Sequence, residues 1–121
     1  MKIYISHSTN FDYQTNLYDP LRANFSNLDI FFPHEKNNDA VDTKQIIKEA
    51  DMILAEVSYP STGQGIELGW ADTFGIPVIC MYRDGTKPSG ALRIISTDII
   101  SYSSAKDLVE KIQRVIPLTE T

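Results

Sequence analysis

The chain of 121 residues is 42% hydrophobic and 22% charged, and its formal net charge is −5. This length fits a single domain with a modest core. Lysine and arginine form no cluster in the sequence, so a protein that follows the phosphate backbone of DNA or RNA is not expected.

In chain order the apolar pattern predicts strands that alternate with helices. The predicted elements are a strand at 2–6, a helical stretch at 12–26, a strand at 28–32, a helix at 42–50, a strand at 51–57, a helix through about Phe74, a strand at 78–82, at most a short helix at 91–95, a strand at 98–102 and a helix at 104–116. Pro20 is expected to mark the first turn of a helix or a break, because a proline inside a helix costs about 3 kcal/mol. Asp42 followed by Gln45 resembles a capping box at a helix start.

This alternation predicts a single-domain α/β fold: a flavodoxin-like open sheet of about five parallel strands with helices on both faces. In such sheets, ligands bind beyond the carboxyl ends of the strands, near the point where the strand order reverses. The loops at that edge are therefore the expected place of a site. They contain residues 7–10, 34–35, 58–65 and 83–89.

The compartment and the cofactors are constrained by the few reactive residues. The single cysteine, Cys80, lies in the apolar run IPVICMY and is expected to be a buried thiol. The sequence has no CxxC motif and no cluster of histidine and cysteine, so neither a metal nor another cofactor is expected. The first residues enter a strand directly, without a signal peptide or a membrane-spanning run. These features predict a cytoplasmic protein that binds no membrane.

Residues 60–71, PSTGQGIELGWA, form a loop of small residues that opens a helix. The glycines give GxGxxxG after the third strand instead of GxGxxG after the first, which argues against a dinucleotide site, and Gly-Lys-Ser/Thr does not occur. Amide groups at a helix N-terminus favour an anion, and Ser61, Thr62 and Gly63 are suitable donors for a phosphate or for sugar hydroxyls. Alternatively, Ser61 and Thr62 only cap the helix.

Glu67 lies near the start of the same helix. An acidic residue in a first turn stabilises a helix by a few tenths of a kcal/mol, which is a sufficient structural reason for its presence. However, Gly65 and Gly69 flank it at helical spacing, and Gly69 costs about 1 kcal/mol relative to alanine. This cost predicts that the glycine face lies close against a neighbour, and it makes Glu67 a catalytic candidate.

Residues 50–83, ADMILAEVSYPSTGQGIELGWADTFGIPVICMYR, resemble the nucleoside 2-deoxyribosyltransferase family. They are most similar to its branch of 2'-deoxynucleoside 5'-monophosphate N-hydrolases, whose pattern contains Ala-Glu-Val and Pro-Ser-x-Gly-x-Gly-x-Glu-Leu-Gly. The resemblance implies that Glu67 is the nucleophile that attacks C1' of the sugar. It implies that Ser61 holds the 5'-phosphate and that Tyr4 lies near the sugar and base. Ser89 is the nearest match to a serine that reaches the phosphate site of a neighbouring subunit, which implies a homodimer.

The chain also departs from the family pattern. The hydrolases follow their first strand with Gly-Ser-x-Arg-Gly-Gly, whereas this chain has SHSTNFD, with Asn10 at the arginine position. The family's second carboxylate aligns with Thr43 without a gap. Asp42 lies one residue away and either substitutes for that carboxylate or only caps its helix.

Cleavage of an N-glycosidic bond passes through an oxocarbenium-like state that a carboxylate below C1' stabilises or traps. A second group must assist the leaving base, and Asp42, His34 and Glu35 are candidates. His34 is attractive because histidine titrates near neutrality, although a solvated histidine after Pro33 is the interpretation that the sequence slightly favours. His7 is a further candidate for a ligand contact. Glu56 is expected to be a structural hydrogen-bonding partner.

The sequence therefore predicts an enzyme that cleaves the base–sugar bond of a nucleoside or nucleoside 5'-monophosphate. The substrate-binding candidates are Tyr4, His7, Asn10, Ser61, Thr62, Gly63, Gly65 and Ser89. One alternative is a deoxyribosyltransferase, in which a second base intercepts the intermediate. Another is a nucleotide-binding or sensing module without turnover. A glycohydrolase that cleaves NAD ranks last, because no motif marks a dinucleotide pocket.

Overall fold

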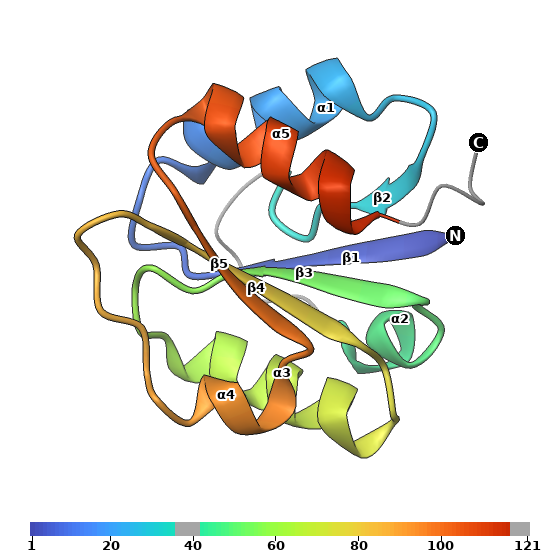
Figure 1. Ribbon diagram of the computed structural model, residues 1–121. Helices are drawn as coiled ribbons and strands as arrows, with labels where there is room; N and C mark the ends of the chain where they lie inside the picture. The colour runs from blue at the N-terminus through green and yellow to red at the C-terminus, as the bar shows by residue number, and fades with distance from the viewer. Residues whose placement is uncertain (36–41, 117–121) are drawn as a thin grey trace.

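A computed structural model describes residues 1–35 and 42–116. Its sheet has five parallel strands in the order β2-β1-β3-β4-β5 (Figure 1). The strands are β1 (Lys2–His7), β2 (Asp29–Phe31), β3 (Met52–Glu56), β4 (Val78–Arg83) and β5 (Asp98–Tyr102). The predicted α/β fold is confirmed, and each predicted strand agrees with an observed one to within two residues at either end.

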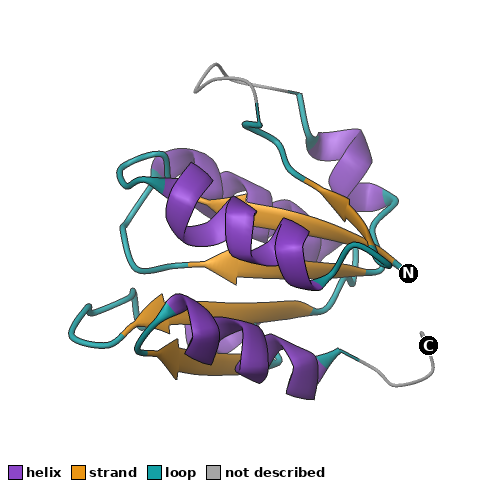
Figure 2. Ribbon diagram, turned by 90° about the horizontal axis from the view of Figure 1, so that it is seen from above, coloured by secondary structure: helices purple, strands orange, loops and turns teal. Residues whose placement is uncertain are grey.

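Helices cover both faces of the sheet (Figures 1 and 2). One face carries the π-helix η1 (Gln14–Tyr18), α1 (Asp19–Asn24) and α5 (Ala105–Val115), and the other carries α2 (Lys44–Lys48), α3 (Thr62–Thr73) and α4 (Leu92–Ile95). Successive strand residues alternate between the two cores, as the pleat requires. Ile3 and Ile5 belong to the core beneath α1 and α5, whereas Tyr4 belongs to the core beneath α2 and α3.

The starts of α1 and α2 can be compared with the predicted ones. Pro20 lies in the first turn of α1, which confirms one of its two predicted places. The chain is not broken there, because α1 follows η1 without a gap and Tyr18 and Asp19 both keep helical backbone angles. α2 begins at Lys44 with Thr43 as its N-cap residue, one residue later than the cap at Asp42 that the sequence pattern predicts. Asp42 therefore precedes the cap instead of forming it.

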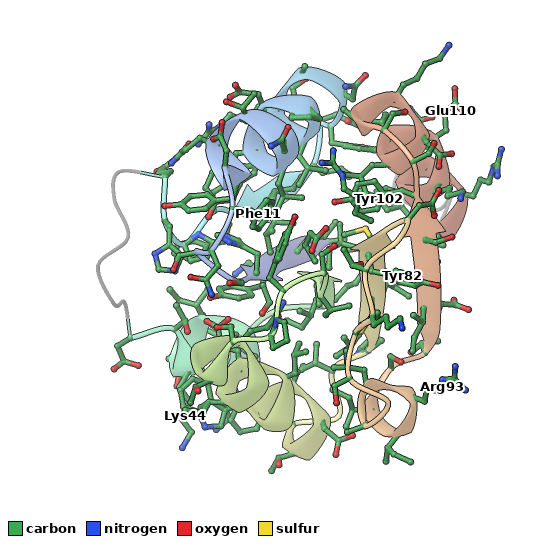
Figure 3. All side chains as sticks on the ribbon, turned by 90° about the vertical axis from the view of Figure 1, so that its left-hand side faces the viewer. Phe11, Lys44, Tyr82, Arg93, Tyr102 and Glu110 are labelled. Atoms are coloured by element: carbon green, nitrogen blue, oxygen red, sulfur yellow. The ribbon has the colours of Figure 1, made fainter. Side chains whose placement is uncertain are left out.

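The strand order reverses between β1 and β3, which lie side by side although β2 separates them in the sequence. His7, the last residue of β1, pairs with Glu56, the last residue of β3. The carboxyl ends of these strands thus meet at one edge of the sheet, where open α/β sheets bind ligands. Figure 3 looks onto this edge, with Phe11 above it and Lys44 below it.

The structure also shows the surroundings of Cys80, the lengths of the helices and the grouping of residues that could bind a metal. Cys80 is fully buried on β4, and burial raises the pKa of its thiol to about 11. Within residues 1–35 and 42–116, no helix is long and apolar enough to cross a bilayer. The same residues contain no group of three or more histidine, cysteine or acidic side chains that could hold a metal ion.

Candidate active site

Three hydroxyl groups converge on the carboxylate of Glu67. The hydroxyls of Tyr4 and Thr43 both donate to Oε2, the latter over 2.8 Å, and Ser6 Oγ donates to Oε1 over 2.9 Å. Tyr4 and Ser6 come from β1, whereas Thr43 precedes α2. Since an ionised carboxylate only accepts hydrogen bonds, this set of donors suits a carboxylate anion held in one orientation.

Tyr4 reaches the site only through its hydroxyl group. Its ring is fully buried and stacks on Phe31 at 5.8 Å between ring centroids. Burial, and then the neighbouring carboxylate of Glu67, raise the pKa of Tyr4 well above its ordinary value. Tyr4 therefore stays protonated and acts as a donor to Glu67. A direct contact between Tyr4 and a sugar or base stays a prediction.

A cavity of about 300 Å³ opens in front of Glu67, at the edge where the strand order reverses. Its lining comes from the end of β1, the segment after β2, the start of α2 and the first turns of α3. The lining residues are His7, Thr9, His34, Thr43, Ser61, Gly63, Gln64, Ile66, Glu67 and Trp70. Its size and mixed polarity are typical of a pocket for a small molecule.

His7 is held as a neutral side chain on the wall of this cavity. The carbonyl of Ser8 can only accept, so Nδ1 of His7 carries the ring proton and donates to it at 2.7 Å. In a neutral ring Nε2 then has no proton and accepts from the hydroxyl of Tyr18 at 2.5 Å, while Tyr18 itself accepts from the backbone N–H of His34. Burial lowers the pKa of His7 to about 4. Both ring nitrogens are thus engaged within the protein, and His7 is not an acid at neutral pH.

His34 differs from His7 in one respect. Its Nδ1 is buried and is the single side-chain nitrogen or oxygen of the described residues that is buried without a hydrogen-bond partner. The two imidazole rings are 5.4 Å apart between centroids. Because buried polar atoms nearly always have partners, an unpaired nitrogen on a residue that lines the cavity is unusual and makes His34 a candidate for a ligand contact.

The two acidic candidates for assistance to the base lie elsewhere. Asp42 is exposed, does not line the cavity, and accepts from the N–H of Lys44 at 3.4 Å. Glu35 is also exposed and pairs with Arg22 at 3.2 Å. On the segment before α2, the side chain that contacts Glu67 is therefore Thr43 and not Asp42.

The loop before α3 divides its residues between two cavities. Ser61 caps α3, since its Oγ accepts from the N–H of Gln64 at 3.4 Å, and it lines the Glu67 cavity together with Gly63. Thr62 is exposed at the first position of the helix, and Asn10 is exposed in the loop after β1. Neither residue is among those that line the Glu67 cavity.

A second cavity of about 350 Å³ lies between α3 and α4. Gly65, Gly69 and Ser89 line it, as does Ser61, which is common to both cavities. A Cβ atom added at Gly65 or Gly69 would meet no described atom within 4 Å. No neighbour within the described residues therefore lies close against this face of α3, which borders a cavity, and the predicted close approach of a ligand or another chain stays a prediction.

Glu56 has the structural role that the sequence suggested. It is buried, and its carboxylate accepts from the N–H of Ser58 at 2.7 Å, from Ser58 Oγ at 2.8 Å and from the hydroxyl of Tyr102. Gln64 donates to the carbonyl groups of Glu56 and Ser6, at 2.8 and 3.2 Å. These bonds tie the first turn of α3 to the ends of β1 and β3.

The sequence analysis did not single out five residues of the site. Ser6, Ile66 and Trp70 lie outside the predicted site loops, whereas Thr9 and Gln64 lie within the predicted loops 7–10 and 58–65. Ser6 is a polar residue at the carboxyl end of the first strand, and that position alone was a usable signal. Trp70 follows Glu67 by three residues and so lies on the same side of α3. Beyond its place in that loop Gln64 offered no signal, because its partners are two carbonyl groups that become neighbours only in the folded sheet.

Comparisons of the sequence find relatives of limited coverage, and no family model matches the chain. The chain is 38% identical over 65 residues to a Syntrophotalea carbinolica protein named "Putative 2'-deoxynucleoside 5'-phosphate N-hydrolase 1", covering 51% of this chain and 46% of the relative. It is 35% identical over 69 residues to a 5-hydroxymethyl-dUMP N-hydrolase of Branchiostoma floridae, covering 53% of this chain and 66% of the relative. A Thermofilum pendens protein, also named "Putative 2'-deoxynucleoside 5'-phosphate N-hydrolase 1", is 33% identical over 78 residues, covering 60% of this chain and 54% of the relative. The chain thus spans about half the length of the first and third of these relatives.

Solved structures extend the likeness over nearly the whole chain. The Clostridium botulinum CMP N-glycosidase BcmB has a TM-score of 0.69 at 19% identity and covers 93% of this chain and 99% of its own. A conserved protein from Enterococcus faecalis V583 has a TM-score of 0.62 at 20% identity, and the match covers 96% of this chain and 99% of that protein. At these identities the two structures show a common fold. The resemblance predicted from residues 50–83 is confirmed by the named sequence relatives.

Proposed function

We propose that this chain, a relative of the nucleotide N-hydrolases of the nucleoside 2-deoxyribosyltransferase-like family, cleaves the base–sugar bond of a 2'-deoxynucleoside 5'-monophosphate. The observation that carries the proposal is the carboxylate of Glu67. Three hydroxyl donors hold it on the wall of a cavity at the edge where ligands bind in this class of sheet. The names of the relatives support a nucleotide as the substrate.

Glu67 would act as the nucleophile. Its carboxylate attacks C1' as the bond between C1' and the base nitrogen breaks, and the electron pair of that bond leaves with the base. The product of this step is a glycosyl ester of Glu67. Water then attacks C1', gives a proton to a base in the site or to solvent, and releases the sugar phosphate and free Glu67.

His34 is the residue we propose to assist the departing base. It lines the same cavity as Glu67, and its buried Nδ1 has no partner within the described part of the chain. A protonated Nδ1 would give its proton to the leaving nitrogen, and a neutral imidazole would still donate a hydrogen bond in the Nδ1–H tautomer. Asp42 is a weaker candidate, because its carboxylate is exposed and bonds to the backbone of Lys44.

The 5'-phosphate would bind at the N-terminus of α3. This helix has 12 residues and begins directly after Ser61, so its free N–H groups and its positive end point toward the cavity that Ser61 and Gly63 line. Thr62 is exposed at the same helix end. The phosphate and the anomeric carbon would then lie along one helix, about one and a half turns apart.

We also propose that the protein is a homodimer in which the segment around Ser89 contributes to the neighbouring site. Ser89 is exposed, and Ile66 and Ile94 on α3 and α4 expose 51% and 84% of their surface. Sedimentation of the wild type and of Ile94→Asp tests this proposal, since a charge in an apolar interface would produce monomers. A monomeric wild type would contradict it.

A cytoplasmic location stays a prediction, compatible with the free thiol of Cys80.

Release of free base is the direct test of the activity. Ribo- and deoxyribonucleosides, with and without 5'-phosphate, are incubated with the wild type, Glu67→Gln and Glu110→Gln, and the bases are separated by chromatography. Glu110 is an exposed residue of α5, far from the cavity, and serves as the matched control (Figure 3). We expect release by the wild type and by Glu110→Gln, with a loss of about a thousandfold or more in Glu67→Gln.

Added acceptor bases separate the alternatives. Formation of a new nucleoside at the expense of hydrolysis would indicate a deoxyribosyltransferase. Binding of a nucleotide without any release would indicate a binding module. Release that Glu67→Gln leaves unchanged would contradict the proposed nucleophile.

A further inference from the structure

The hydrogen bonds of Glu67 are distributed unequally over its two oxygens. Oε2 accepts from the hydroxyls of Tyr4 and Thr43, whereas Oε1 accepts from Ser6 alone among the described residues. Each carboxylate oxygen has two lone pairs in the carboxylate plane. Oε2 therefore has both acceptor sites filled, and Oε1 retains one for another group.

The hydroxyl of Thr43 bonds to Glu67 and does not cap α2, the helix that it precedes. As the N-cap residue of α2, it has the side chain that most often accepts from a backbone N–H of the first turn. No such bond is present among the described residues, and the hydroxyl donates to Glu67 instead. The carbonyl of Thr43 accepts from the N–H of the buried Ile47 at 2.9 Å, and Thr43 as a whole is only 3% exposed. The hydroxyl is thus fixed against Glu67 by the start of a helix.

We propose that Thr43 is a positioning residue: with Tyr4 it occupies Oε2 of Glu67 and leaves Oε1 as the oxygen that attacks C1'. This inference rests on the proposed function. It also gives position 43, where the family pattern described in the sequence analysis implies a carboxylate, a different role in this chain. A carboxylate there would face the carboxylate of Glu67 across one hydrogen-bond length, so that the two could not both be ionised without strong repulsion.

Three substitutions test whether the hydroxyl of Thr43 positions Glu67 or whether Thr43 merely stands where an acidic residue would be expected. Thr43→Val keeps the shape and removes the donor, Thr43→Ser keeps the donor, and Thr43→Asp restores a carboxylate. Thr73→Val, at the exposed end of α3, is the matched control. Base release is measured below the melting temperature of every variant, and kcat and KM are determined separately.

We expect Thr43→Val to lower kcat about tenfold or more with KM changed less than threefold, because the lost bond orients the nucleophile and does not bind substrate. Thr43→Ser should retain kcat within about threefold, and Thr43→Asp should lose at least as much as the valine variant. Wild-type kcat in Thr43→Val, or a gain in Thr43→Asp, would overturn the inference. A larger loss of kcat in Ser6→Ala than in Thr43→Val would reverse the assignment of the two oxygens and so also overturn it.

Crystal structures of the valine and serine variants give a readout that does not require turnover. We expect the Glu67 carboxylate to rotate, or to occupy two conformations, in Thr43→Val, and to keep a single orientation in Thr43→Ser. An unchanged carboxylate in Thr43→Val would overturn the positioning role. If wild type and Glu67→Gln release no base, the proposed function fails, while these structures still decide whether Thr43 holds Glu67.

Discussion

Ser6 Oγ lies 2.9 Å from Oε1 of Glu67, and this bond joins the carboxyl end of β1 to α3 across 61 residues of sequence. Ser6 is fully buried, so no water competes for its hydroxyl. We predict that Ser6→Ala lowers kcat about three- to tenfold, since Oε2 keeps its two donors, and that it costs about 1 kcal/mol of unfolding free energy. Steady-state kinetics and urea unfolding measure the two effects. A complete loss of activity in a folded Ser6→Ala protein would contradict this prediction.

Gln64 is predicted to matter for stability more than for chemistry. Its amide is the donor to the carbonyl groups of Ser6 and Glu56, so Gln64→Ala would leave buried carbonyl oxygens short of a partner. We expect a loss of about 1–3 kcal/mol in urea unfolding. Gln113→Ala, on the exposed side of α5, is the control and should change stability by less than about 0.5 kcal/mol. Equal effects of the two substitutions would show that the Gln64 bonds do not stabilise the fold.

His7 predicts a specific loss of stability in acid. Burial lowers the pKa of His7 from its ordinary value of 6.5 to about 4. Between these values the unfolded chain binds a proton that the folded protein does not, so stability falls as the pH falls from about 6.5 to 4. The contribution of His7 over this range is about 3 kcal/mol.

Comparison with His7→Gln isolates this contribution from that of the carboxylates. The amide oxygen of glutamine can accept from Tyr18 as Nε2 does, and the side chain does not titrate. Urea unfolding at several pH values should show a shallower decline for His7→Gln than for the wild type between pH 6.5 and 4. Parallel declines would indicate that His7 is protonated in the folded protein.

Gly69 is predicted to tolerate alanine. An added Cβ would meet no described atom within 4 Å, and the position lies in the middle of α3. Alanine should therefore raise the unfolding free energy by about 0.5–1 kcal/mol, measured as a higher melting temperature. A lower melting temperature, together with dissociation in sedimentation experiments, would instead show that a second copy packs against this face.

The fold followed from the sequence because its signals are local. Apolar runs of strand length and the proline at position 20 are each visible within a few residues. The nucleophile candidate Glu67 was visible for a similar reason, since its motif is contiguous. The structure adds the cavity around that residue and the hydroxyl donors that orient it.

The rest of the site could not be predicted, because it depends on contacts between distant segments. Thr43 and Asp42 are neighbours in the sequence, yet only the start of α2 decides which of them faces Glu67. The glycines of α3 looked like packing residues because a helix interior rarely contains them, but their face borders a cavity. His34 could not be separated from a solvated histidine by sequence, because its place on the cavity wall and its unpaired Nδ1 both depend on the folded chain.

The central claim is that the carboxylate of Glu67 forms a bond to the sugar. Its most direct test is mass spectrometry of the intact protein, quenched in acid during turnover of the best 2'-deoxynucleoside 5'-monophosphate and then digested. The account predicts an added deoxyribose phosphate on the peptide that contains Glu67, and none in Glu67→Gln. Base release at the wild-type rate by Glu67→Gln, or an adduct on a different peptide, would contradict it.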